Sequence, residues 1–299
     1  MTYKNSVKIL SSNFSLCWKQ LLWQLIGGAL VAGIAFAAAT PVLQMLKNNG
    51  FFSSTANVFG SIYAAPKKFP SMSVDLIETF GDLIKAHAHT LWPSYVGFFL
   101  ILLLGTNFVS CVGRYACGEV ISAKMASNAS ISFTNRLFST LGRSVSFACV
   151  NLLVAIPFVA AIVGVGIAYV KLAQTTATTI ALLPVASLVI YLLFATKLTI
   201  SSCHMPSMID GNRNPFTAFG KGLKQMSQTR FWRTFSSSIC VVLTIVFVNV
   251  FIAIFTVGAG LIITIPASSV FVACFNETTF YAMSKRNFYI SELIVVNLK

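Results

Sequence analysis

Three polar side chains lie deep inside long apolar runs, where they could do chemistry. Lys197 and Glu277 are the charged members, and Asn107 is their polar counterpart in a third run. An ionisable group in hydrocarbon is costly unless it is paired or hydrated, so each is a functional candidate. If the spans form a threefold repeat, Lys197 and Glu277 could form an ion pair with Asn107 beside it, lining a cleft open to the cytoplasm. The structural alternative is that Lys197 reaches the membrane interface and Glu277 ends a helix.

Two further acidic residues, Glu119 and Asp210, follow apolar runs and could form a carboxylate pair at one membrane face. Helix ends and turns also use such residues routinely. The sequence holds no Walker loop, no G-x-S-x-G elbow and no H-E-x-x-H motif. Its three histidines give no full ligand set, and no C-x-x-C pair occurs. We therefore predict no catalytic site, no metal site and no cofactor.

The elements that position these residues are membrane helices. Apolar residues make up 56% of the chain and charged residues only 9%, against about 25% charged residues in soluble domains. Runs of about 20 apolar residues can cross the hydrocarbon core as helices. We predict an all-α integral membrane protein, with residues 1–299 as one membrane domain. The expected spans are 21–43, 91–113, 145–170, 180–203, 235–256 and 261–283.

The distribution of basic residues predicts the orientation. Fifteen of the 21 Lys and Arg fall at the termini and in the loops on one side of the six spans. The positive-inside rule places that side, with both termini, in the cytoplasm of a bacterial cell. Basic loops against an anionic inner leaflet explain the net charge of +14 without a nucleic-acid partner. A cleavable signal peptide is the less favoured reading of the first apolar run, which is a full span.

The six spans read as three helical hairpins, each preceded by an interfacial amphipathic helix. A proline is expected to open each even-numbered span, and an acidic residue follows 26 positions later. The pairs are Pro93 with Glu119, Pro184 with Asp210, and Pro266 with Glu292. A constant spacing in three copies indicates an internal repeat, which is common among transporters.

The first hairpin carries a long outer loop, residues 47–90. Within it, residues 74–89 have a helical pattern, with acidic Asp75 and Glu78 early and Lys85 late, as the helix dipole favours. We expect this helix to lie on the outer membrane surface. Surface loops carry much of the protein-specific recognition in membrane proteins, so a membrane-protein partner is expected here.

The most distinctive segment is 204–235, HMPSMIDGNRNPFTAFGKGLKQMSQTRFWRTF. Pro206 and Pro215 are expected to end and restart helices, and the pair Asp210-Gly211 to form a turn. An amphipathic helix follows, and Trp232 beside two arginines would anchor the next span at the interface.

With these residues the segment resembles the inner loop of a bacterial six-span membrane-domain family, found fused to some glycerophosphodiester phosphodiesterases and in related proteins of unknown function. The family's usual serine on the amphipathic helix is replaced by Gly222 or Leu223. The resemblance implies a membrane module without the hydrolase activity, since no soluble domain is present to carry it.

Two functional classes follow from these patterns. The first is a non-enzymatic membrane protein, a transporter-like or accessory component that handles a lipid, a peptide or a partner protein. The alternative is a membrane-embedded enzyme acting on lipid head groups, with Glu119, Asp210 or Glu277 as the acid or base.

Overall fold

The computed structural model describes residues 2–65, 67–173, 175–211, 214–226, 228–291 and 294–296. This part of the chain is almost wholly helical, and six of its helical stretches are long and apolar enough to cross a membrane. They are Ser15–Ala38, Phe69–Ser127, Leu141–Leu172, Thr178–Gly211, Arg230–Thr256 and Leu261–Met283. The prediction of an all-α, multi-pass membrane protein is confirmed.

The chain divides into two compact units. One contains Met1–Leu25 and Asn107–Lys299, and the other contains Ile26–Thr106. Helices α2 (Ser15–Ala38) and α5 (Phe69–Ser127) each contribute to both units. The candidate site residues all belong to the first unit.

The second unit contains the C-terminal part of α2, the N-terminal part of α5 and two short helices between them, α3 (Thr40–Asn48) and α4 (Phe51–Ala64). Gly50 joins them with a φ of 69°, a left-handed conformation that favours glycine. Phe51 contacts Phe80 of α5, with ring centroids 5.2 Å apart. The helix predicted at 74–89 is not a separate element: it is part of α5, which is 59 residues long.

The three repeat prolines do not begin helices. Pro93, Pro184 and Pro266 lie inside α5, α8 (Thr176–Ser201) and α12 (Leu261–Met283). The stronger start signals lie upstream: Thr175 caps α8 through its side chain, and a turn at Gly258, with a φ of 85°, precedes α12. Neighbouring helices let membrane spans tolerate an internal proline. Glu292, the third acidic residue of the predicted repeat, lies outside the described residues.

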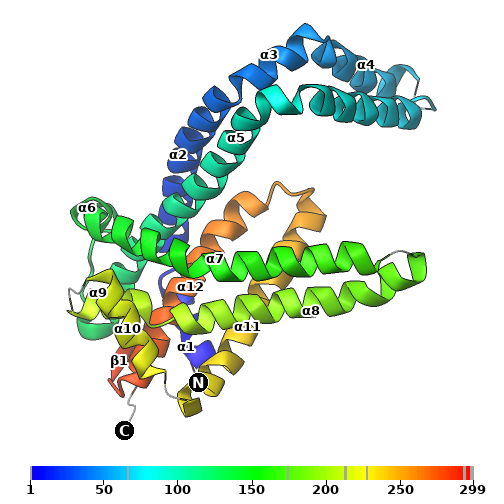
Figure 1. Ribbon diagram of the computed structural model, residues 1–299. Coiled ribbons are helices and arrows are strands. Elements are labelled where there is room, and N and C mark those ends of the chain that lie inside the picture. The colour runs from blue at the N-terminus through cyan, green and yellow to red at the C-terminus, as the bar shows by residue number, and fades with distance from the viewer. Residues whose placement is uncertain are drawn as a thin grey trace. The chain divides into compact units, whose positions relative to one another are not determined.

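The first unit is built by helices that pack in sequence order (Figure 1). Helix α7 (Leu141–Leu172) lies along α8, α8 contacts α11 (Gln228–Thr256), and α11 contacts α12. Helix α1 (Thr2–Ser12) lies against α12, where the Ser6 and Thr278 hydroxyls are 2.6 Å apart. Three short helices, α6 (Phe133–Ser139), α9 (His204–Gly211) and α10 (Pro215–Gln225), complete this unit.

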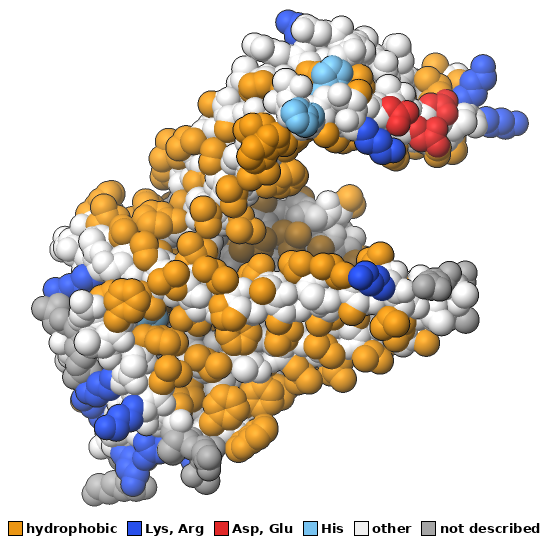
Figure 2. Space-filling model, in the orientation of Figure 1, with side chains coloured by type: hydrophobic (Ala, Val, Ile, Leu, Met, Phe, Trp, Pro, Cys, Tyr) orange, Lys and Arg blue, Asp and Glu red, His pale blue; other side chains and the backbone are white. Residues whose placement is uncertain are grey.

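The core of this unit is formed mainly by the C-terminal part of α5 and the C-terminal half of α12, against which α1, α2, α6, α7 and α9 pack. Its central members, Cys111, Tyr115, Cys117, Met205 and Cys274, are fully buried. By contrast, α7, α8 and α11 present apolar side chains outward, as lipid contact requires (Figure 2). Basic side chains gather around α9, α10 and the C-terminal strands in the same view.

The chain ends in an antiparallel ribbon that the sequence patterns did not predict. Strand β1 (Phe288–Ser291) pairs with β2 (Ile294–Val296). Phe288 and Ile290 are buried in the core, and Ser12 of α1 donates a hydrogen bond to the Ile290 carbonyl at 3.0 Å. The ribbon is too short for a sequence period to be recognised, and tertiary packing holds it in place.

Candidate functional site

Glu277 is the most unusual ionisable residue in the first unit. Helix α12 places it in the core, where its exposure is 0% and neither carboxyl oxygen has a hydrogen-bond partner. The side chain of Ser122 on α5 lies beside the carboxyl without reaching hydrogen-bond geometry. A bare charge is very costly at such a position, so this packing accommodates the protonated, neutral form.

Glu119 and Asp210 are the acidic neighbours of Glu277. We call these three residues the acidic trio. Glu119, on α5, is 7% exposed, and its Oε2 lies 3.2 Å from Nη1 of Arg136 on α6. Arg143 of α7 is a second cation near Glu119. The carboxylate that sequence spacing placed at the membrane face is therefore held in a largely buried ion pair.

Asp210, at the end of α9, is paired with Arg286. The guanidinium donates two hydrogen bonds to the Asp210 carboxylate, at 2.5 and 3.2 Å. These bonds raise the pKa of Arg286 above its usual value. The guanidinium also lies 5.7 Å from the centre of the Phe280 ring. Each flanking member of the trio thus has an arginine, whereas the central member has none.

Other buried polar atoms near the trio lack partners. The Tyr115 hydroxyl, which is near Glu119, Arg143 and Glu277, makes no hydrogen bond in the described part of the chain, and neither does the hydroxyl of Ser207 on α9. Native structures hold few such groups. No three His, Cys, Asp or Glu side chains among the described residues are arranged to hold a metal ion. The region therefore concentrates unused hydrogen-bonding capacity around one carboxyl group.

Lys197 does not reach this region. The ion pairs among the residues that the structure describes are Lys85–Asp82, Arg136–Glu119 and Arg286–Asp210. Lys197 instead lies near Arg114 and Cys111 of α5. Glu277 lies near Glu119 and Ser122, which are farther along the same helix. The proposed Lys197–Glu277 pair is not formed, because the two side chains lie beside different turns of α5.

Asn107 joins the surroundings of Lys197. Its Oδ1 accepts a hydrogen bond from the Cys111 thiol at 3.3 Å, and the Cys111 sulfur accepts one from Asn151 of α7 at 3.2 Å. Asn107 and Lys197 thus share Cys111 as a neighbour. The predicted polar cluster separates into this group and the acidic trio.

The distinctive segment 204–235 follows its predicted outline in part. Pro215 begins α10, and Asn214 caps that helix by accepting a hydrogen bond from the Phe216 amide. Pro206 lies buried inside α9 and does not end a helix, and Gly211 is the last residue of α9. Trp232 is 68% exposed and packs edge-on against Phe231 and Phe235.

Several residues of the site were missed by sequence reasoning. Arg136 and Arg286 were counted only among the basic residues of the cytoplasmic side, and Tyr115 was not considered. His204 was not considered: it is 1% exposed, lies between the rings of Phe147 and Phe219, and contacts the Pro215 carbonyl through Nε2 at 3.1 Å. No spacing links these residues to the trio, so only the fold could find them.

No protein-family model, curated protein or solved structure matches this chain.

Proposed function

We propose that this protein is a non-enzymatic, transporter-like membrane component that handles a lipid, with Glu277 at its working centre. The observation that carries the proposal is the enclosed carboxyl group without a partner. Intramembrane ionisable residues are costly and are usually functional. A purely structural core would be at least as stable with an apolar side chain in that place.

Glu277 would act in a second conformation, in which its carboxyl group is accessible. In a transport cycle, opening of the α5, α9 and α12 contacts would let water or ligand reach the carboxyl, and closing would return it to the neutral form. The ion pairs at Glu119 and Asp210 would tie α6 and the end of α12 to this movement. A lipid is the favoured ligand because the resemblance of segment 204–235 implies a module related to enzymes of glycerophospholipid metabolism.

Leaflet exchange in proteoliposomes tests the proposal. Purified protein is reconstituted with a fluorescent phospholipid, and dithionite quenching measures the rate at which the label crosses the bilayer. We expect exchange above that of protein-free vesicles and at least a tenfold lower rate for Glu277→Gln, which keeps the shape but cannot ionise. Glu78→Gln, the same change at an exposed residue of α5, is the matched control and should leave the rate unchanged.

An absence of protein-dependent exchange, or equal rates for Glu277→Gln and wild type, would overturn the proposal. The alternative, a membrane-embedded enzyme for lipid head groups, is favoured only by the electrostatic interaction of Glu277 with Glu119 and Asp210. Two of them are already engaged by arginines. New lipid products, detected by mass spectrometry after incubation with phospholipid vesicles, would establish the enzyme instead.

The proposed orientation places both termini in the cytoplasm, with three hairpins that each follow an interfacial helix. Alkaline phosphatase is active only outside the cytoplasm, and a fluorescent protein reports the cytoplasmic side. We expect phosphatase activity from an insertion at Gly50, and fluorescence without phosphatase activity from fusions after Lys299. The opposite result at either position would reject this orientation.

A further inference from the structure

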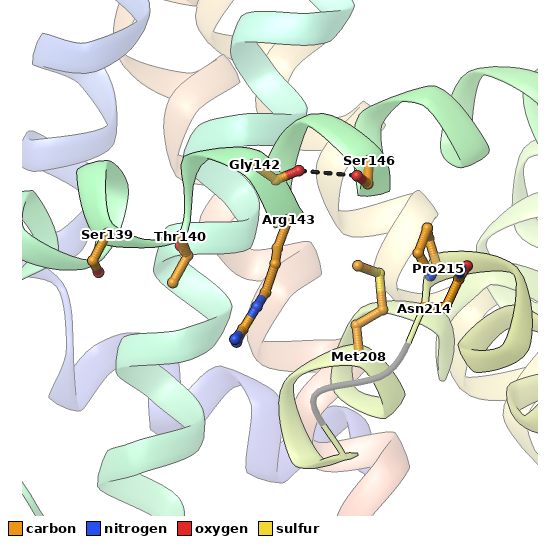
Figure 3. Close-up of a pocket in the computed structure, with 8 residues that line it drawn as sticks. All are labelled: Ser139, Thr140, Gly142, Arg143, Ser146, Met208, Asn214 and Pro215. Atoms are coloured by element: carbon orange, nitrogen blue, oxygen red, sulfur yellow. Dashed lines mark hydrogen bonds between the residues drawn. The ribbon is translucent and has the colours of Figure 1, made fainter.

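A polar pocket of about 410 Å³ lies between the start of α7 and the start of α10 (Figure 3). Both helices belong to the first unit, and the end of α6 and one side chain of α9 complete the walls. Among the described lining residues, Arg143 is the one charged side chain and none is acidic. The lining is Ser139, Thr140, Gly142, Arg143, Ser146, Met208, Asn214 and Pro215.

Arg143 gives the pocket a positive charge. Its side chain extends from the first turn of α7 between Thr140 on one side and Met208 on the other (Figure 3). The Glu119 carboxylate, which is near Arg143, is already paired with Arg136 at 3.2 Å. The two arginines and one carboxylate leave a net positive charge, so the guanidinium remains able to bind an anion.

Two further groups supply hydrogen-bond donors. Helix α7 begins at the pocket without a side-chain cap: the Thr140 hydroxyl donates to the Arg136 carbonyl at 2.7 Å instead. The first amides of α7 therefore remain available to an acceptor. Across the pocket, the Oδ1 of Asn214 accepts from the Phe216 amide at 3.1 Å, so its NH₂ group is free to donate.

Exposed apolar side chains adjoin the lining residues in the chain. Phe138 and Leu141 flank Ser139 and Thr140 and are 66% and 42% exposed, and Phe216, which follows Pro215, is 64% exposed. A small soluble anion would gain no binding energy from contact with these apolar side chains. A lipid does, because its acyl chains can cover them while its head group enters the polar space.

We propose that this pocket binds a phosphoryl group, and that the group is the head group of an anionic phospholipid. Guanidinium and helix amides suit the three oxygens of a phosphomonoester, and the volume admits one such group with its glycerol. The inference rests on the proposed function and deepens it by naming the class of lipid.

Binding of short-chain lipids to the full-length protein in detergent tests the site. The probes are dihexanoyl phosphatidic acid, dihexanoyl phosphatidylcholine and inorganic phosphate, measured by calorimetry. We expect phosphatidic acid to bind at least tenfold more tightly than either of the others, and Arg143→Gln to weaken it at least tenfold. Arg233→Gln, at an exposed arginine of α11 outside the pocket, is the matched control and should bind as wild type.

Unchanged binding in Arg143→Gln would overturn the inference. Equal binding of inorganic phosphate and phosphatidic acid would overturn the lipid assignment in favour of a free phosphate, and equal binding of phosphatidylcholine would overturn the anionic preference. Should Arg143→Gln fail to fold, Ser146→Phe fills the same pocket and should also abolish binding; retained binding there would reject the site.

The binding and exchange experiments fail separately. Glu277→Gln should lose leaflet exchange and keep the binding of phosphatidic acid. Binding that depends on Arg143 in a protein that exchanges no lipid would reject the proposed function and leave the pocket standing. Exchange without such binding would reject the pocket alone.

Discussion

Arg136→Ala should lower the free energy of unfolding by roughly 2 to 3 kcal/mol, because it leaves the Glu119 carboxylate without its counter-charge. Glu119 is only 7% exposed and cannot recover its hydration. The cost stays below the upper end for a fully buried pair because the Arg136 side chain is 38% exposed. Arg143 lies near Glu119 and compensates in part. The midpoint of thermal unfolding in detergent, followed by intrinsic fluorescence, measures the effect.

Removing the stranded charge should restore stability. Glu119→Gln in the Arg136→Ala background should return most of the lost free energy, since a neutral amide costs less to bury. The more exposed ion pair between Arg286 and Asp210 offers a comparison. Arg286→Ala should lower the free energy of unfolding by only about 0 to 1 kcal/mol, because both side chains are accessible to water. A double variant as unstable as Arg136→Ala alone would show that Arg136 acts through packing and not through charge.

The membrane fold could be predicted because its signal is long. An apolar run of about 20 residues is recognised as a span even when its ends are misplaced by a few positions. The overall fold class follows from composition. The prolines misled in detail: Pro93 and Pro184 looked like helix starts, yet α5 and α8 begin upstream of them. A local start signal is weak where other helices supply the packing that stabilises the helix.

For the candidate site, the sequence identified the unusual acidic residues but not the residues that they contact. Glu119, Asp210 and Glu277 stood out because acidic residues are rare in an apolar chain, and the fold places them as neighbours. Their partners did not stand out. Arg286 lies 76 residues from Asp210, and neither charge pattern nor spacing connects them. The hypothesis that Lys197 pairs with Glu277 was wrong, because the sequence does not show which turn of α5 lies beside each side chain.

Gly113→Val should damage the packing of the first unit severely, with an expected loss of about 3 kcal/mol or failure to fold. A Cβ at this position of α5 would meet the Gln20 side chain and would lie 2.5 Å from Cδ1 of Trp23, both on α2. Neither can move away easily. Gln20 is fully buried, and the Trp23 indole is held by a hydrogen bond to the Val109 carbonyl at 2.8 Å.

Gly97→Val on the same helix is the matched control. A Cβ there would have no atom within 4 Å, so the same substitution should change stability by less than about 1 kcal/mol. Expression level, the monodisperse fraction in detergent and the unfolding midpoint distinguish the two variants. Equal stability of Gly113→Val and Gly97→Val would mean that α2 and α5 do not approach closely at Gly113. The core around Glu277 would then be packed less tightly, and water could reach the carboxyl group without any conformational change.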